Sequence, residues 1–466
     1  MHARPARPSA MNADDNGLPL PQRYWAILCV AFGVLLAVLD GAIANVALPT
    51  IARDLQASDA ASIWIVNAYQ LAVTISLLPL AALGDRIGYR RVYVAGLMLF
   101  TVSSLGCSLA GSLVSLATMR VIQGFGAAGI MSVNTALVRT IYPSRLLGRG
   151  VALNAMVVAL ASAIGPTVAS AVLAFAPWPW LFAINVPIGI VAITLGLRAL
   201  PVTRGHDAPY DYLSALLNAC VFGLVIVTVD SLGHGVNYAL VAAGALGALG
   251  LGYVLVRRQL TQPAPLLPVD LLRIPVFALS IGTSVASFTS QMLAFVALPF
   301  WLQHTLGLSQ VETGLYMTPW PLVIVVAAPL AGVLSDRYSA GVLGGIGLAL
   351  FAAGLLALAM LDAHPAAGDI IWRMALCGAG FGLFQSPNNR TILSSAPRHR
   401  SGGASGMLGT ARLTGQTLGA ALVALIFGVV PARGPTVALY AATAFAALAA
   451  CVSLLRLGAR APDTAA

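Results

Sequence analysis

The sequence predicts an all-α integral membrane protein with two six-helix bundles, an inserted two-helix hairpin, and fourteen transmembrane helices in total. Three observations predict this class. The 466 residues are 59% hydrophobic and only 9% charged, apolar runs of membrane-spanning length recur along the chain, and a short motif appears in both halves. A soluble domain carries about 25% charged residues. The composition suits a lipid environment, where helices satisfy their own backbone groups.

Apolar runs bounded by Arg, Asp, Pro or Gly mark the expected helices. A window of about 19 residues places them at 25–48, 62–83, 92–111, 114–138, 150–175, 181–200, 212–230, 238–256, 277–302, 315–334, 341–361, 370–392, 403–430 and 436–456. The expected regions are a cytoplasmic tail (1–23), a first bundle (24–200), a linker with the hairpin (201–275), a second bundle (276–456) and a cytoplasmic tail (457–466). The first run is too long for a signal-peptide core, so we expect it to be retained.

The arginines give an independent test of this count. The chain has no lysine, so all 25 basic residues are Arg. With the N-terminus inside, only Arg53 and Arg433 lie outside, Arg120, Arg373 and Arg412 fall within spans, and the other twenty are cytoplasmic. Cytoplasmic loops of membrane proteins are enriched in Arg and Lys. We therefore expect a multi-pass protein of the bacterial inner membrane with both termini cytoplasmic, and attribute the net charge of +10 to orientation rather than to nucleic acid.

The sequence excludes some functions. A Walker A phosphate loop requires a lysine, which rules out a self-contained ATP-driven pump. The chain has no HExxH or GxSxG motif, and its five cysteines show no metal-ligand spacing. Neither an enzyme nor a metal or organic cofactor is expected. The missing lysine does not exclude coupling to a separate ATPase, and the energy source we expect is the proton gradient.

An internal repeat divides the chain into halves. The stretch "LGDR" at 83–86 is echoed by "LSDR" at 334–337, and Arg120 is echoed by Arg373 near the start of the corresponding helix. Duplicated bundles of this kind hold their substrate near the bilayer midplane, between the halves, and work by rocking one half against the other.

Asp40 is the most informative residue, because it lies in an otherwise uncharged run from Trp25 to Leu48. An Asp at the centre of a membrane helix costs about 2.5–3.5 kcal/mol. At 1.5 Å per residue it stands roughly 22 Å along its helix, a depth compatible with Arg120, which cannot lose its proton. Burial and a neighbouring Arg shift the proton affinity of an Asp in opposite directions. We therefore expect this pair to couple proton uptake and release to transport. The alternatives are a structural anchor for Asp40 and a snorkelling Arg120.

Five stretches resemble signature sequences of the major facilitator superfamily. They are "LDGAIANVALPTIARDL" (39–55), "GDRIGYRR" (84–91), "RVIQGFGAAG" (120–129), "AIGPTVAS" (163–170) and "WPWLFAINVPIG" (178–189). The first and last, with fourteen spans, resemble its drug:proton antiporter branch of multidrug exporters. The resemblance covers about residues 24–456 and associates Arg120 with proton coupling.

The resemblance also implies roles for two further motifs. The loop between helices 2 and 3 and its repeat would form a conformational latch on the cytoplasmic side; its residues are Asp85, Arg86, Gly88, Arg90, Arg91, Asp336 and Arg337. The alternative is an ordinary Arg-rich orientation signal, and Ala81 stands where the family has a leading glycine. Gly165 and Pro166 would form the kink that the family associates with antiport, although Ala169 and Ser170 replace its paired glycines.

Polar and aromatic side chains at helical spacing mark the expected substrate cavity. The candidates are Asn45, Asn67, Tyr69, Gln70, Gln123, Asn154, Ser287, Gln291, Trp320, Gln385, Asn388, Arg412 and Gln416. For the polar residues the alternative is hydrogen bonding between helices. For the aromatic residues it is packing or interface anchoring.

The predicted function is a proton-coupled antiporter that exports amphipathic, mainly cationic drugs such as quaternary ammonium compounds and dyes. The spans hold few acids, which favours monovalent cargo. The alternative is a proton-coupled transporter of one specific metabolite, working as an exporter or as an uptake symporter. The expected partners are hydrophobic or cationic small molecules, protons and the lipid bilayer, with no nucleic acid, and we expect a monomer.

Overall fold

The computed structural model of the protein describes residues 17–203, 210–233, 238–262, 265–362, 364–397 and 400–458. All regular secondary structure in these ranges is helical. Most of the two predicted tails, residues 1–16 and 459–466, lies outside the described residues. The same holds for five of the arginines assigned to the cytoplasm, namely Arg4, Arg7, Arg204, Arg398 and Arg460.

The first half supplies six spans. Its elements are α1 (Gln22–Asp54), α2 (Asp59–Ser62), α3 (Trp64–Ile87), α4 (Tyr89–Ser108), α5 (Leu113–Ile141), η1 (Ser144–Leu146), α6 (Leu147–Phe175), α7 (Pro179–Ala183) and α8 (Asn185–Ala199). Two spans are interrupted: α2 meets α3 at Ile63, and α7 meets α8 at Ile184. Gly88 ends α3 with a φ of 99°, a left-handed conformation that favours glycine, so α4 starts at the next residue.

The inserted hairpin and the second half follow. Their elements are α9 (Tyr212–Gly233), α10 (Tyr238–Thr261), η2 (Val269–Arg273), α11 (Pro275–Phe300), the π-helical turn η3 (Trp301–Thr305), α12 (Gln310–Met317), α13 (Pro319–Leu334), α14 (Ala340–Ala359), α15 (Ala367–Ser395), α16 (Ser401–Val429), η5 (Pro431–Arg433) and α17 (Gly434–Leu455). The span formed by α12 and α13 is interrupted at Thr318, which precedes Pro319.

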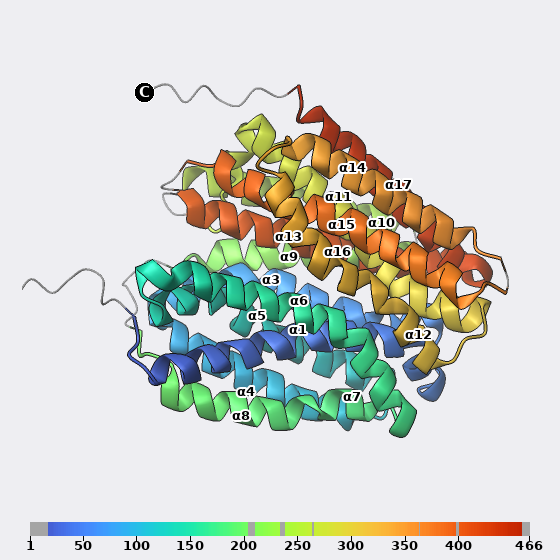
Figure 1. Ribbon diagram of the computed structural model, residues 1–466, viewed down its shortest axis with the longest axis horizontal. Coiled ribbons are helices and arrows are strands. Elements are labelled where there is room, and N and C mark those ends of the chain that lie inside the picture. The colour runs from blue at the N-terminus through green and yellow to red at the C-terminus, as the bar shows by residue number, and fades with distance from the viewer. Residues whose placement is uncertain are drawn as a thin grey trace, which may run out of the picture.

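Thirteen of these helical segments are long and apolar enough to cross a membrane. The fourteenth predicted span corresponds to α15, which has 29 residues but is less apolar because Asp369, Arg373 and a polar stretch around Asn388 lie within it. The predicted all-helical membrane fold is therefore confirmed. In Figure 1, α1 begins toward the same end of the bundle at which α17 finishes, as an even number of crossings requires.

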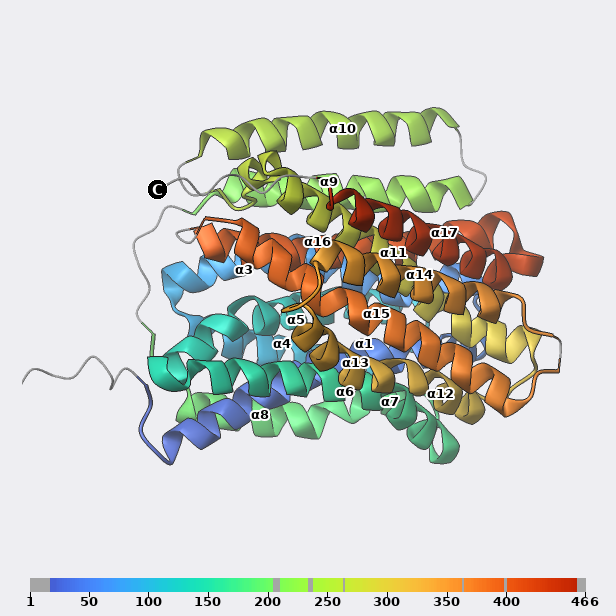
Figure 2. The same cartoon turned by 45° about the horizontal axis from the view of Figure 1, so that its top comes forward.

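The helices pack into two groups with the hairpin beside them. In the first half, α5 packs on α3 and α4, and α1 packs on α6 and α8; in the second, α11 packs on α16 and α17, and α15 on α13 and α14. Figure 2 shows α9 and α10 side by side along one flank, with α10 outermost. Because α9 also contacts α3 and α16, the hairpin adjoins both halves.

Polar contacts between the halves gather at the end opposite the arginine-rich loops, here called the outer end. Thr50 donates to Gln310 Oε1 at 2.8 Å, and Ser170 donates to the carbonyl oxygen of Val311 at 3.0 Å. Asp59 Oδ2 lies 3.2 Å from His304 Nδ1. Midway along the same interface, Thr74 and Thr417 share a 2.8 Å hydrogen bond. The halves are therefore joined at their outer ends in this conformation.

Candidate functional site

Asp40 and Arg120 form an ion pair in the interior of the first half. Each side chain is only 1% exposed, and Arg120 Nη1 donates to Asp40 Oδ2. Asp40 lies roughly 27 Å along α1 from Gln22 at 1.5 Å per residue, which puts it beyond the midpoint of the helix toward the outer end. The two charged residues predicted to pair thus do so, and each neutralises the other within the membrane.

Two amides complete the surroundings of the carboxylate. Gln123 Nε2 and Asn185 Nδ2 donate to Asp40 Oδ1 at 3.0 Å and 2.8 Å. Asp40 therefore accepts hydrogen bonds from α5 and α8 while it belongs to α1. Both carboxyl oxygens of Asp40 are thus occupied by donors from these two helices.

Arg120 has further partners that do not depend on Asp40. Its Nε donates to the carbonyl oxygen of Ile65 at 3.0 Å, and its Nη1 donates to Gln123 Oε1 at 2.6 Å. The ring of Tyr69 lies 4.2 Å from the guanidinium carbon, a cation–π contact. If Asp40 takes up a proton, Arg120 keeps this second set of contacts.

Close helix packing lets Arg120 reach α3. A Cβ atom at Gly124 would lie 2.6 Å from the carbonyl oxygen of Tyr69, and one at Gly126 would lie 2.5 Å from the backbone nitrogen of Phe100. These contacts leave no room for a side chain. The glycines of the stretch 120–129 thus bring α5 against α3 and α4, and one turn before Gly124 the arginine enters the space between helices.

Asn185 was missed by sequence reasoning. It is fully buried at the first position of α8, directly after the break at Ile184. A single Asn in a short apolar run has no periodic pattern to mark it. The available signals were its place in the stretch 178–189 and Pro187 two residues later.

The second half does not reproduce the buried pair. Arg373, the counterpart of Arg120, forms a 3.1 Å ion pair with Asp369 of its own helix, and both side chains are partly exposed. The position 251 residues after Asp40 holds Gln291, whose amide side chain does not ionise. The titratable arrangement therefore belongs to the first half.

The predicted antiport kink lies where the halves meet. A Cβ atom at Gly165 would lie 2.4 Å from the Cβ of Ala42 on α1. Across the interface, a Cβ atom at Gly314 of α12 would lie 2.5 Å from the carbonyl oxygen of Pro166 and 1.8 Å from Ser170 Oγ. Gly165 and Pro166 thus permit close contact with α1 and α12 together. Their role in antiport remains a prediction.

The predicted latch residues of the first half contact only neighbouring segments. Asp85 accepts a 2.8 Å hydrogen bond from the hydroxyl of Tyr89, and Arg86 Nη1 donates to the hydroxyl of Tyr212 at 3.1 Å. Arg90 donates to the carbonyl oxygen of Leu197, and Arg91 Nη1 lies 3.5 Å from that of Ile87. None of these side-chain contacts reaches the second half.

In the second half, Asp336 accepts a 2.5 Å hydrogen bond from Arg390 of α15, and Arg337 is exposed. Each half therefore holds its own version of the loop in this conformation, and a latch between the halves remains a prediction.

Comparison with known proteins identifies the family. The family model described as Major Facilitator Superfamily matches residues 30–420 and 279–465. The chain belongs to the Major Facilitator Superfamily. It is 59% identical over 444 residues to the "Uncharacterized transporter YebQ" of Escherichia coli (strain K12), covering 95% of this chain and 97% of that one.

Two further relatives carry more specific names. The "Riboflavin transporter RibZ" of Clostridioides difficile (strain 630) is 30% identical over 410 residues, covering 88% of this chain and 89% of that one. The "Multidrug efflux pump LfrA" of Mycolicibacterium smegmatis is 31% identical over 411 residues, covering 87% and 81%. The protein is thus a multi-pass membrane transporter related to drug-efflux pumps, and not an enzyme.

The predicted cavity residues of this superfamily member fall into three groups. Gln123 and Tyr69 belong to the Asp40–Arg120 cluster described above. A second group is almost fully buried in helix packing: Asn45, Asn67, Ser287, Trp320 and Asn388. The third group is partly exposed and consists of Gln70, Asn154, Gln291, Gln385, Arg412 and Gln416.

The buried group largely makes contacts between helices. Asn388 donates to Ser284 Oγ at 2.8 Å and accepts a 2.7 Å hydrogen bond from Arg456, whose side chain is buried although the sequence placed it on the cytoplasmic side. Trp320 contacts Phe295 in a tilted arrangement and Phe351 edge to face. In the third group, Gln70 Nε2 lies 3.4 Å from Gln416 Oε1 in the other half, and Asn154 accepts from Asn134 at 3.1 Å.

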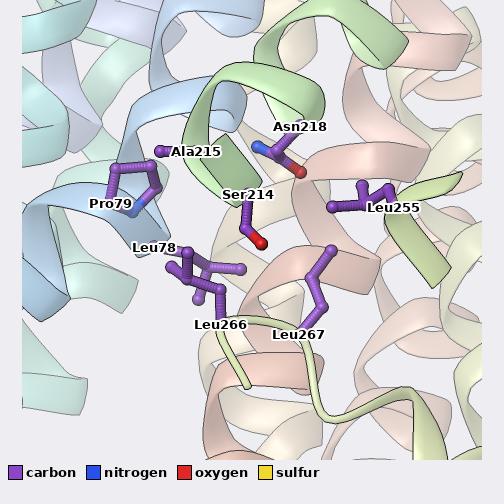
Figure 3. A pocket seen from close by; sticks show the side chains of 8 residues that line it. All are labelled: Leu78, Pro79, Ser214, Ala215, Asn218, Leu255, Leu266 and Leu267. Carbon is purple, nitrogen blue, oxygen red and sulfur yellow. The ribbon is translucent and has the colours of Figure 1, made fainter. Parts of the chain in front are cut away.

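A small crevice between α3, α9, α10 and the linker contains none of the predicted cavity residues. It is lined by Leu78 and Pro79 of α3, by residues of α9 and α10, and by the linker at Leu267 (Figure 3). Ser214 and Asn218 of α9 border it. The crevice has no room for a water molecule, so it does not accommodate a drug-sized cargo in this conformation.

Proposed function

We propose that this transporter exports amphipathic drugs from the cell in exchange for protons, by alternating access. The observation that carries the proposal is the buried Asp40–Arg120 pair, bridged by Gln123 and Asn185. An acid in a membrane span is costly and marks a functional site. Through its hydrogen bonds, Asp40 of α1 connects three spans, α1, α5 and α8. These spans must move relative to one another if the first half is to change shape.

Protonation would act on these contacts directly. A proton on Asp40 removes the charge that attracts Arg120 and converts one carboxylate oxygen into a donor, so the bonds from Arg120, Gln123 and Asn185 cannot all persist. Proton uptake therefore removes the ion pair between α1 and α5, while Arg120 keeps its contacts with Ile65 and Gln123.

The contacts between the halves indicate what the loss of this ion pair would move. Thr50, ten residues beyond Asp40 on α1, bonds to Gln310 of α12, and the α6 kink packs against Gly314. A movement of α1 is transmitted to this outer contact because one helix carries both residues. Opening the outer end would expose cargo to the outside.

The cargo proposed from the sequence is a set of mainly cationic amphipathic drugs and dyes, and the relation to a multidrug efflux pump supports this class. The relation to a riboflavin transporter favours a second candidate, the proton-coupled transport of one specific metabolite. The range of transported compounds distinguishes the two candidate functions. An exporter of drugs transports several unrelated dyes, whereas a metabolite transporter transports one compound.

The experiment is dye efflux in a bacterial host whose own drug pumps have been deleted. Cells that express the protein should lose several preloaded dyes faster than cells with an empty vector, and a protonophore should abolish the difference. Efflux that continues at the same rate with the protonophore would contradict proton coupling. Accumulation of a single compound, with no effect on dyes, would favour the metabolite transporter.

A further inference from the structure

Arg412 differs from the other two arginines within spans. Arg120 is paired with Asp40, and Arg373 is paired with Asp369. Arg412 forms no hydrogen bond or ion pair with any residue that the structure describes. Its Nε is sealed from solvent without a partner, while the residue as a whole is only partly buried.

The depth of Arg412 makes this lack of a partner costly. It stands roughly 16 Å along α16 from Ser401 at 1.5 Å per residue, near the middle of the membrane. The guanidinium cannot give up its proton, and an ionised side chain at this depth is expensive unless it is paired or lines a wet cavity. Such a residue is a candidate for contact with the transported molecule.

Neighbouring residues on α16 show which way Arg412 faces. On a helix, residues three or four positions apart share a face. Gly409 and Gln416 lie three before and four after Arg412, and both meet α3: a Cβ atom at Gly409 would lie 3.7 Å from Leu77, and Gln416 contacts Gln70. Gly415, three after Arg412, packs on Val285 of α11. Arg412 therefore points between α3 and α11, which belong to different halves.

The polar groups beside Arg412 on this face are uncharged. Gln416 lies one turn farther out, and its 3.4 Å contact with Gln70 is long for a hydrogen bond. Asp40, the acid in the interior of the first half, is occupied by Arg120 and the two amides. Among the described residues, the part of the interface beside α3 and α11 thus presents the positive charge of Arg412 with amide groups near it, a set that recognises an anion rather than a cation.

We infer that Arg412 and the adjacent Gln416 bind the anionic group, a carboxylate or sulfonate, of an amphipathic organic cargo. This inference rests on the proposed export function and replaces its mainly cationic cargo with an anionic one. The planar guanidinium matches a carboxylate with two parallel hydrogen bonds, and the apolar body of the cargo would occupy the rest of the interface. An organic anion should then bind more tightly than a cation built on the same ring system.

Two dyes test this ranking, because fluorescein and rhodamine 123 share a xanthene ring but carry opposite charge at neutral pH. We would measure the binding of each by fluorescence anisotropy to the full chain in nanodiscs of phosphatidylcholine, a lipid without net charge that could not occupy an anion site as an anionic lipid would. The wild type should bind fluorescein more tightly than rhodamine 123. A wild type that prefers rhodamine 123, or that binds no fluorescein, overturns the inference.

Substitutions test whether Arg412 is the residue that makes the protein bind fluorescein more tightly than rhodamine 123. Arg412→Gln should weaken fluorescein binding by about tenfold or more, as expected for a lost hydrogen bond to a charged group, and should leave rhodamine 123 binding unchanged or stronger. Arg412→Lys should restore much of the fluorescein affinity. Arg433→Gln, at an exposed arginine of the outer end, is the matched control. Equal loss of both dyes in Arg412→Gln, or no loss, overturns the inference; if this variant does not fold, the wild-type ranking decides.

Transport separates this inference from the proposed function. If fluorescein binds through Arg412 but a proton gradient drives neither dye across a membrane, the site stands and the export function fails. If rhodamine 123 is exported while fluorescein does not bind, the export function stands and the anion site fails.

Discussion

Asn185 of α8 donates a 2.8 Å hydrogen bond to Oδ1 of Asp40 on α1, so the sixth span of the first half is tied to the first through the carboxylate itself. Both residues are buried, at 0% and 1% exposure. The ion pair with Arg120 is thus one part of a larger cluster, and each of its donors can be changed separately.

The first prediction concerns this amide. Asn185→Leu removes a donor to an ionised group, and such a hydrogen bond contributes about 1.5–3 kcal/mol. We expect the rate of dye efflux to fall by about tenfold at equal expression. Thr194→Ala, at an exposed position on the same helix, should leave the rate near the wild-type value. An Asn185→Leu variant with normal efflux would show that this contact is not needed.

The second prediction concerns stability. Removing one partner of a buried ion pair costs about 3–5 kcal/mol, because the other charge is left uncompensated. Arg120→Gln and Asp40→Asn should therefore each lower the thermal midpoint in detergent. The double variant should be more stable than the sum of the two losses implies. Additive losses would contradict direct coupling between the two side chains.

The third prediction concerns the outer contact. Gly314→Ala adds a Cβ atom that would lie 2.5 Å from the backbone carbonyl oxygen of Pro166, so the halves must separate at that end. Spin labels at Asp54 and Leu315 should report a longer distance than in the unmodified protein. Gly332→Ala is the control, since its Cβ atom would lie 3.4 Å from Ser386 Oγ. An unchanged distance would mean that this contact does not hold the halves together.

The fourth prediction concerns pH and the inserted hairpin. Partial burial would raise the pKa of Asp211, but hydrogen bonds from Arg258 and Ser214 lower it below its usual value. A group whose folded pKa is lowered contributes stability above its unfolded pKa, about 3.9, and loses it as the pH falls through the folded value.

Asp211→Asn should therefore destabilise the protein at neutral pH by about 0.5–1 kcal/mol, as for a partly exposed ion pair. The difference from wild type should shrink when unfolding is measured below the folded pKa. An equal difference at both pH values would show that the effect of the substitution does not arise from the charge of Asp211.

Hydropathy predicted the helices because a membrane span must be long and apolar, and each predicted run overlaps an observed one. The ends were less accurate. α1 extends from Gln22 to Asp54, beyond the predicted 25–48, since polar end turns still form backbone hydrogen bonds. The breaks at Ile63, Ile184 and Thr318 were not predicted, because hydropathy does not detect a change of direction within an apolar run.

The candidate site was predictable where a charge stood out. Asp40 and Arg120 were conspicuous in apolar runs, and they meet. Asn185 was not, because an uncharged amide is common in spans and its partner lies 145 positions away. Arg456 was assigned to the cytoplasmic side because it ends an apolar run, but its burial against Asn388 and Ser280 was not predicted. Only the packing of α11, α15 and α17 could reveal that.

The most direct test of the account measures proton coupling at Asp40 in purified protein. Proteoliposomes that contain wild type or Asp40→Asn would be given a pH gradient and a transported dye, and dye exchange without a gradient would be recorded in parallel. The wild type should accumulate dye against its concentration gradient, whereas Asp40→Asn should exchange dye but not accumulate it. Accumulation by Asp40→Asn at the wild-type rate would contradict the role assigned to this carboxylate.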